Sequence, residues 1–179
     1  MSMETDPERI FVVDADNRPL AVMSLQEIHA QGLMHRGFLL LLRDRRGRLA
    51  LRRLPADHPR HPGRWDVAGS GHVGADEAAE EAAHRHLPAP AAALEDNLGH
   101  VRTLAPAPGA AGPGTGAEIV EIFEAELPDQ AALELSRDLS FLFVDRDELD
   151  ALVASFPDQL SPDLLSVWET LLHDPGTAS

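Results

Sequence analysis

The segment Gly71–Leu87, with the sequence GHVGADEAAEEAAHRHL, constrains the fold of this chain more than any other segment. We predict a glycine-containing loop here, followed by a helix over Asp76–Leu87. Pro88 comes directly after the segment, and the residue before a proline is pushed out of the α region. The helix is therefore expected to end near Leu87.

The predicted helix has two chemically different sides. An α-helix turns by about 100° per residue, so residues three, four and seven apart share a side. One side carries three alanines and a histidine: Ala79, Ala82, Ala83 and His86. The opposite side carries the acidic residues and a second histidine: Glu77, Glu80, Glu81 and His84. We interpret the acidic side as a solvated surface on which Glu81 and Arg85 form an i,i+4 ion pair.

The spacing of Gly71, Glu77 and Arg85 resembles the Nudix box, G-x5-E-x7-R-E-U-x-E-E-x-G-U, a loop-helix-loop that holds metal ions against a diphosphate. The resemblance implies a hydrolase in which Glu77 and Arg85 are the surviving catalytic-site residues, with the role of orienting the loop and the helix. The family's three later glutamates are replaced here by His86, Ala89 and Pro90. Mg²⁺ prefers oxygen ligands, usually a few carboxylates together with substrate phosphates. The sequence therefore predicts a degenerate box that binds magnesium weakly or not at all.

A wider resemblance runs from Phe11 to Leu87, to the Nudix branch related to isopentenyl-diphosphate isomerase. The segments that carry it read VVDADNRPL, EIHAQGLMHRGF, GRLALRRL and HPGRWDVAGSGHV, with FVDRDELDAL nearer the C-terminus. In the isomerase a cysteine before the box glycine acts on the substrate, and a tyrosine is also used. This chain has Ser70 at the cysteine position and no tyrosine at all. Because serine is a far weaker acid than cysteine and nothing near Ser70 in the sequence resembles an activating base, we do not expect isomerase activity.

The resemblance also implies a set of metal ligands. His29 and His35 match two histidines that precede the first long strand of the isomerase, His72 matches a third, and Glu118 matches a glutamate on a later strand. Of these, His35, His72 and Glu118 are the candidate metal ligands. Imidazoles with a carboxylate would suit a divalent transition metal. The alternative is that His35 and His72 are packing or hydrogen-bonding residues.

Two further residues are candidates for substrate binding. Arg53 resembles a diphosphate contact of the same branch, and a guanidinium suits bidentate phosphate binding. The alternative for Arg53 is an outward-facing, solvated position on a strand. Trp65 could stack on a ligand or pack under the box loop, and we favour packing.

The remaining sequence predicts an α/β fold. Apolar or alternating runs predict strands at Ile10–Val13, Leu20–Met23, His35–Leu42, Leu49–Leu54, Trp65–Val67, His100–Leu104, Glu118–Leu127 and Phe141–Val144. Capping signals start further helices at Ser24, Asp145 and Ser161. Strands on both sides of one central helix predict the Nudix fold, an α/β/α sandwich around a mixed sheet. We expect a single domain over residues 1–179, with flexible tails at 1–8 and 174–179 and a mobile loop at 105–117.

Composition limits the possible partners. The net charge is −15 and every basic side chain is arginine, so nonspecific nucleic-acid binding is not expected. The absence of cysteine excludes disulfides, thiolate metal sites and cysteine nucleophiles. We find no apolar run long enough to span a membrane and no signal-peptide pattern, and expect a cytoplasmic protein that does not bind membranes.

Two functional hypotheses remain open at this stage. The first is a Nudix hydrolase that cleaves a diphosphate linked to another moiety with Mg²⁺ or Mn²⁺, slowed or inactivated by the missing glutamates. The second is a non-catalytic Nudix-fold protein that binds a small phosphorylated ligand or a partner, with a transition metal or no metal. The branch contains both monomers and homodimers, so both states are open.

Overall fold

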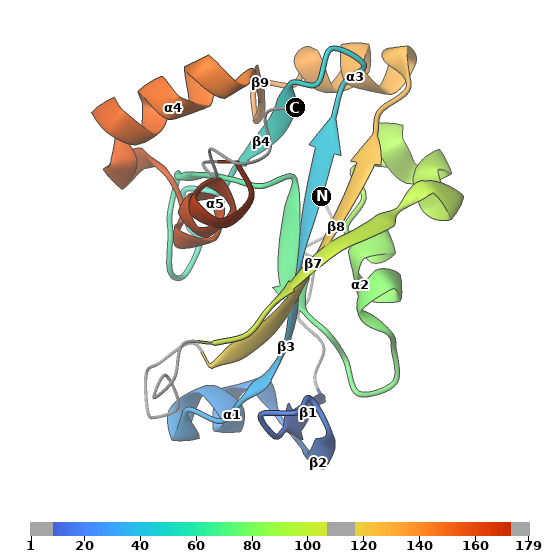
Figure 1. Cartoon of the computed structure of the whole chain (residues 1–179), viewed down its shortest axis with the longest axis vertical. Coiled ribbons are helices and arrows are strands. Elements are labelled where there is room, and N and C mark those ends of the chain that lie inside the picture. The colour runs from blue at the N-terminus through green and yellow to red at the C-terminus, as the bar shows by residue number, and fades with distance from the viewer. Residues whose placement is uncertain (1–8, 107–116, 173–179) are drawn as a thin grey trace. The chain divides into compact units, whose positions relative to one another are not determined.

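The computed structural model describes residues 9–106 and 117–172 (Figure 1). The predicted tails at 1–8 and 174–179, and residues 107–116 of the predicted mobile loop, lie outside this part of the chain. The described residues form two compact units. The first unit falls within Met1–Leu40, Gly69–Leu87 and Leu94–Glu124, and the second within Leu41–Ala68, Pro88–Ala93 and Ala125–Ser179. Each unit is described separately below.

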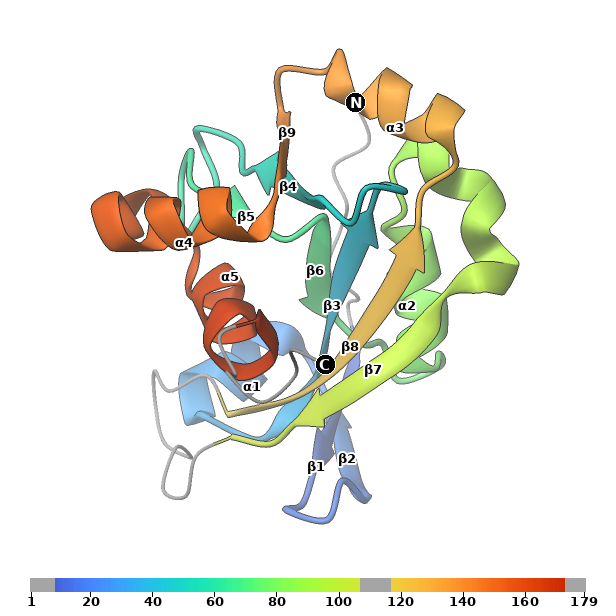
Figure 2. The same ribbon diagram turned by 45° about the horizontal axis from the view of Figure 1, so that its top comes forward.

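The first unit is built on strands of both directions. Its strands are β1 (Ile10–Val13), β2 (Pro19–Met23), most of β3 (His35–Arg43), β6 (Gly69–His72), β7 (Gly99–Leu104) and most of β8 (Glu118–Glu126). β3 pairs antiparallel with β6, and β8 pairs with both β3 and β7 (Figure 2). The arrows of β3 and β8 point the same way in Figure 1. The predicted α/β class with a mixed sheet is confirmed.

Helix α1 (Leu25–Gln31) follows the β1–β2 hairpin. Ser24 and Glu27 form the predicted capping box, in which the Ser24 hydroxyl accepts the Glu27 N–H and the Glu27 carboxylate accepts the Ser24 N–H. Gly32 ends the helix with a left-handed backbone, φ 61°, which glycine adopts without steric cost. Ile28 packs from this helix against Ile10 and Val12 and is fully buried.

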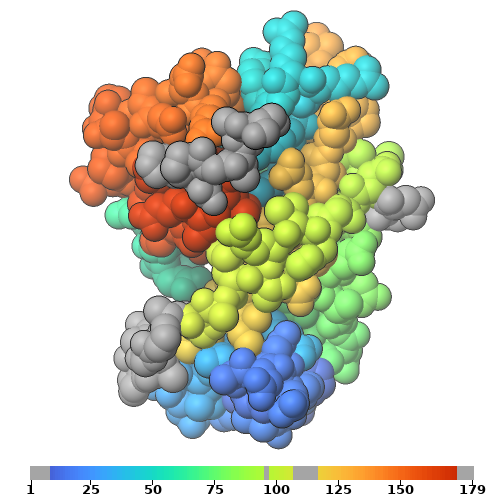
Figure 3. All heavy atoms as spheres, viewed as in Figure 1, coloured from blue at the N-terminus to red at the C-terminus, as the bar shows by residue number. Residues whose placement is uncertain are grey.

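Helix α2 (Ala79–Arg85) is the central helix predicted from sequence, although it is shorter than Asp76–Leu87 at both ends. Its alanine side is buried as expected, against Phe38 of β3 and Phe123 of β8. After α2 the chain enters a 3₁₀ segment, η1 (Ala89–Asn97), in agreement with the helix-terminating effect of Pro88. β7 is exposed along most of its length, and its yellow-green atoms lie at the surface in Figure 3.

The second unit combines short strands with the C-terminal helices. Its further elements are β4 (Leu49–Arg53), β5 (Trp65–Asp66), α3 (Asp129–Ser136), β9 (Phe141–Val144), α4 (Arg146–Ser155), η2 (Pro157–Gln159), α5 (Pro162–Val167) and η3 (Trp168–Leu172). β4 pairs antiparallel with β5 and with β9. Asp145 and Ser161 cap α4 and α5 as predicted. No helix in the described ranges is both long enough and apolar enough to cross a membrane.

A tight turn joins the end of β3 to β4. The Asp44 carboxylate accepts hydrogen bonds from the backbone N–H groups of Arg46 and Arg48 at 2.9 Å each, and from Arg48 Nε at 2.8 Å. Burial raises the pKa of Asp44, but these hydrogen bonds outweigh burial and lower the pKa below its ordinary value. Gly47 supplies the left-handed residue of the turn, with φ 79°.

Candidate metal centre

Three histidines and a glutamate converge in the first unit. They are His29 from α1, His35 from the start of β3, His72 from the end of β6 and Glu118 from the start of β8. Each offers one donor atom, and these atoms all lie within 4.8 Å of one another. His35 and His72 are buried, whereas His29 and Glu118 are partly buried. The structure thus brings together the candidate ligands His35, His72 and Glu118 and adds His29.

Strand register explains why the cluster forms. His35 and Gly37 lie two apart on β3 and therefore share a face, and His72 on β6 is paired directly with Gly37. The His35 N–H donates to the carbonyl of Ala117, which fixes the start of β8 beside β3. A Cβ at Gly37 would lie 3.3 Å from Glu118 Oε2, so the glycine leaves room for the carboxylate.

One carboxylate oxygen joins two of the imidazoles. Glu118 Oε1 lies 3.1 Å from His35 Nε2 and 3.1 Å from His72 Nε2. Burial raises the pKa of Glu118, but the hydrogen bonds from His35 and His72 outweigh burial and hold the pKa far below its ordinary value. Glu118 is therefore ionised and offers a negative charge beside His35 and His72. The centroids of the three imidazole rings are 5.2 Å apart in each pair.

The backbone orients one of these rings. His35 Nδ1 lies 2.9 Å from the carbonyl oxygen of Leu33, which can only accept, so Nδ1 carries the proton. Histidines that bind metals commonly donate the other ring N–H to a backbone carbonyl or a carboxylate in this way. The Nε2 atom of His35 faces Glu118, and a metal ion bound through this atom would replace its hydrogen bond to the carboxylate.

The donor spacing fits a small divalent ion. A tetrahedral ion with bonds of about 2.1 Å needs donors about 3.4 Å apart. The Glu118 contacts with His35 and His72, at 3.1 Å, are already close to that spacing. The most distant donors, within 4.8 Å of each other, would have to approach by about 1.4 Å at most, which side-chain rotation can supply.

The box residues Glu77 and Arg85 form a bidentate ion pair. Arg85 Nη2 and Nε donate to the two Glu77 oxygens at 2.6 and 2.9 Å, and Glu77 Oε1 also accepts the Gly74 N–H at 2.9 Å. Burial raises the pKa of Glu77, but the hydrogen bonds from Arg85 and Gly74 lower it overall. The pair ties the loop before α2 to the last turn of the helix.

The predicted ion pair between Glu81 and Arg85 on the helix surface is wrong. Arg85 directs its bidentate hydrogen bonds to Glu77 rather than to Glu81. The physical reason is that Glu81 is the third residue of α2, where its carboxylate accepts the Ala78 N–H at 2.7 Å and caps the helix. Glu77 precedes the helix and is free to turn toward Arg85.

His86 occupies the position of the family's first box carboxylate, and it is a packing residue. Its side chain is 6% exposed, and Nδ1 donates to the Ala82 carbonyl at 2.8 Å. The ring meets Phe38 edge-on with centroids 4.8 Å apart. A Cβ at Gly71 would lie 3.3 Å from His86 Nε2, so the imidazole fills the space beneath this glycine.

His86 and the three clustered histidines lie on opposite faces of the strands. Phe38 alternates with His35 and Gly37 along β3, and Gly71 alternates with His72 along β6. His86 contacts the side of these strands that α2 covers, whereas the cluster of His29, His35, His72 and Glu118 (hereafter the imidazole cluster) lies on the other. The acidic residues of α2 are therefore not ligands of the imidazole cluster.

The candidate substrate-binding residues Arg53 and Trp65 are neighbours in the second unit. They are paired in the β4–β5 register, and the Arg53 guanidinium lies 6.0 Å from the centre of the Trp65 ring. Arg53 Nε also donates to the Gly63 carbonyl at 3.2 Å. Arg53 is thus held over an aromatic face, and a role in binding substrate stays a prediction for both residues.

Comparison with known proteins identifies relatives over part of the chain, although no protein-family model matches it. The chain is 34% identical over 80 residues to an isopentenyl-diphosphate Δ-isomerase of Burkholderia multivorans, covering 45% of this chain and 46% of that protein. It is 36% identical over 83 residues to an uncharacterised Nudix hydrolase of Pseudomonas aeruginosa, covering 46% and 49%. The chain thus spans about half the length of the curated relatives that it matches.

Solved structures are similar over most of the chain. A crystal structure from Deinococcus radiodurans matches with a TM-score of 0.68 and 15% identity, covering 90% of this chain and 98% of the other. A mutT/nudix family protein from Listeria innocua matches with a TM-score of 0.52 and 21% identity, covering 76% and 88%. At these identities the similarity establishes the fold.

Proposed function

We propose that this chain, which is similar to Nudix proteins over about half of its length and shares their fold, binds a small diphosphate-containing ligand together with a divalent transition metal held by the imidazole cluster. We further propose that magnesium-dependent hydrolysis is slow or absent. One observation carries the proposal: His29, His35, His72 and Glu118 converge within 4.8 Å, while the box positions that would bind Mg²⁺ hold no carboxylate.

The residues at the box do not fit Mg²⁺. This ion takes oxygen ligands in near-octahedral geometry. His86 offers only ring nitrogens, one of which is bonded to Ala82, and Ala89 offers no donor in its side chain. Glu77 is occupied by Arg85 and Gly74. We therefore derive no chemical step from a magnesium ion at the box.

The imidazole cluster fits a different class of ion. Imidazole ligands suit zinc, iron, nickel or copper better than magnesium, and one carboxylate balances part of the charge. When bound, such an ion would supply positive charge that polarises a phosphoryl oxygen of a ligand. His35 and His72 would hold it through Nε2, with Glu118 as the anionic ligand and Leu33 orienting the His35 ring.

A second candidate function is hydrolysis of a diphosphate linked to another moiety. It is favoured by the similarity to two uncharacterised Nudix hydrolases, of Pseudomonas aeruginosa and Yersinia pestis. The preserved Glu77–Arg85 pair is compatible with it, because this pair fixes the box loop against α2. Hydrolysis would require that the imidazole cluster supply the metal.

Turnover assays distinguish ligand binding without catalysis from diphosphate hydrolysis. Purified protein is incubated with Mg²⁺, Mn²⁺ or Zn²⁺ and a panel of nucleoside di- and triphosphates, diphosphate conjugates and isopentenyl diphosphate. We expect no isomerisation, because Ser70 replaces the cysteine and tyrosine is absent, and no more than slow phosphate release with Mg²⁺. A Nudix hydrolase with a complete box serves as the positive control.

Two results would contradict this expectation. Conversion of isopentenyl diphosphate at a rate comparable to a true isomerase would show that Ser70 suffices. Rapid Mg²⁺-dependent hydrolysis would show that carboxylates outside the box rebuild a magnesium site. Hydrolysis with Mn²⁺ or Zn²⁺ that is lost in His72→Ala would instead assign the reaction to the imidazole cluster.

A further inference from the structure

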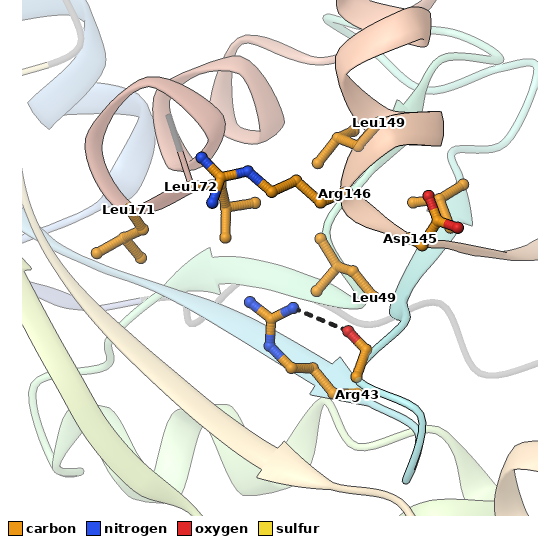
Figure 4. A pocket seen from close by; sticks show the side chains of 9 residues that line it. Arg43, Leu49, Asp145, Arg146, Leu149, Leu171 and Leu172 are labelled. Carbon is orange, nitrogen blue, oxygen red and sulfur yellow. Dashed lines mark hydrogen bonds between the residues drawn. The ribbon is translucent and has the colours of Figure 1, made fainter. Parts of the chain in front are cut away.

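The second unit contains a cavity of about 270 Å³ that the proposed function does not use (Figure 4). It is lined by the end of β3, β4, the end of β9, the start of α4 and the last residues of η3. None of its lining residues belongs to the imidazole cluster or to the box. Its volume lies just below the roughly 300–1,000 Å³ of drug-sized sites, so a ligand would be small.

Most of the wall is aliphatic. The apolar side chains are Leu49, Val144, Leu149, Leu171 and Leu172. Three of these side chains are buried, namely those of Leu49, Val144 and Leu149. The other two, Leu171 and Leu172, are partly exposed. Such a wall favours the apolar part of a ligand through removal of its surface from water.

Two guanidinium groups stand at the same cavity. Arg43 comes from the end of β3 and Arg146 from the first turn of α4, and Figure 4 shows both side chains reaching toward Leu171 and Leu172. Arg43 Nη1 donates to the Gly47 carbonyl at 3.2 Å, which holds this arginine near the cavity. Guanidinium groups bind carboxylates and phosphates through paired N–H donors.

The one acidic side chain among the lining residues is already engaged. Asp145 Oδ1 accepts the Glu148 N–H at 2.8 Å and caps α4. The cavity therefore combines two cations with one anion, in a chain whose net charge is −15. Two guanidinium groups at one cavity are a feature that binding of an anion would use.

The wall formed by the C-terminal helix has an uncommon backbone. Leu171 and Leu172 end η3, a π-helical turn over Trp168–Leu172 that continues α5. π-helical turns are rare and occur frequently at functional sites. Both leucines line the cavity.

From these observations we infer that the cavity binds a small anion with an aliphatic body, such as an alkyl phosphate or an alkyl carboxylate. The anionic head lies between Arg43 and Arg146, and the aliphatic part lies against Leu49, Leu149 and Leu171. Because Arg146 is exposed, its contribution weakens as ionic strength rises. This site is independent of metal binding at the imidazole cluster.

Calorimetric titration of the full chain with hexyl phosphate, hexanoate and hexanol tests the inference. We expect saturable binding of one hexyl phosphate per chain and no saturable binding of hexanol. Arg146→Gln is expected to weaken hexyl phosphate binding at least tenfold, because it removes one guanidinium from an exposed position where folding is not at risk. Arg137→Gln, at another exposed arginine of the second unit, is the matched control and should change the affinity less than twofold.

Comparison of the two anions distinguishes a general anion site from a phosphate site. Hexanoate binding alongside hexyl phosphate identifies a general anion site, and binding of hexyl phosphate alone identifies a phosphate site. Leu171→Phe, which narrows the cavity and leaves both arginines in place, should also weaken binding. The inference is overturned if neither anion binds saturably, if hexanol binds as well as the anions, or if Arg146→Gln and Arg137→Gln have the same effect.

Discussion

Replacing His72 by alanine is expected to weaken Zn²⁺ or Mn²⁺ binding at least about 100-fold, beyond the 10–100-fold typical of changes outside the ligand shell. The substitution removes one imidazole and one of the two hydrogen bonds that Glu118 Oε1 receives in the metal-free protein. His72 is buried, and its ring centroid lies 5.2 Å from those of both His29 and His35. Titration calorimetry on wild type and variant measures the change directly.

His100→Ala is the matched control for this prediction. His100 is an exposed histidine on β7 of the same unit, hydrogen-bonded to Thr103 and outside the imidazole cluster. Its replacement should leave metal affinity within about twofold, since it removes an imidazole that binds no metal. Equal affinities of wild type and His72→Ala would mean that any metal binds elsewhere.

Restoring the family's first glutamate, in His86→Glu, is expected to destabilise the fold by about 3 kcal/mol, the scale for a buried polar or charged group left without a partner. His86 lies between Phe38 and Gly71, and its one hydrogen bond goes to a carbonyl, which cannot donate to a carboxylate. A glutamate would either be buried unpaired or force α2 away from the strands. Urea unfolding followed by circular dichroism measures the loss.

Ala89→Glu restores the second glutamate and serves as the comparison. Ala89 is exposed, so its replacement should change stability by no more than about 0.5 kcal/mol. Native-like stability of His86→Glu, together with new magnesium binding, would show that the box is a magnesium site lacking only its carboxylate. Loss of stability without magnesium binding agrees with His86 as a packing residue.

Local sequence signals identified much of the fold because their physics is local. Ser24, Asp145 and Ser161 cap the helices that they were expected to start, since capping needs only the next three residues. The alanine side of α2 followed from helical periodicity alone.

Two elements escaped prediction because their stability is not local. β6 reads Gly-Ser-Gly-His, which has low strand propensity, and it is a strand because β3 pairs with it. Helix α3 begins after Pro128 without a side-chain cap, so the usual start signal is missing. The Glu77–Arg85 pair was likewise missed, because Glu77 lies before the helix and helical spacing does not apply to it.

The imidazole cluster could not be derived from periodicity either. His35 and Glu118 are 83 residues apart, and their contact depends on the pairing of β3 with β8. Family resemblance supplied these residues, and the structure shows that His29 joins them. No sequence signal pointed to the cavity at Arg43 and Arg146, because its lining residues come from five separate elements.

We expect this chain to bind its divalent metal at the imidazole cluster and not at the box. The most direct measurement is calorimetric titration of the wild-type chain with Zn²⁺ or Mn²⁺ and, separately, with millimolar Mg²⁺. We predict one transition-metal ion per chain, lost in Glu118→Ala, and no measurable heat of binding for Mg²⁺. Tight Mg²⁺ binding that survives both Glu118→Ala and His72→Ala would contradict the account.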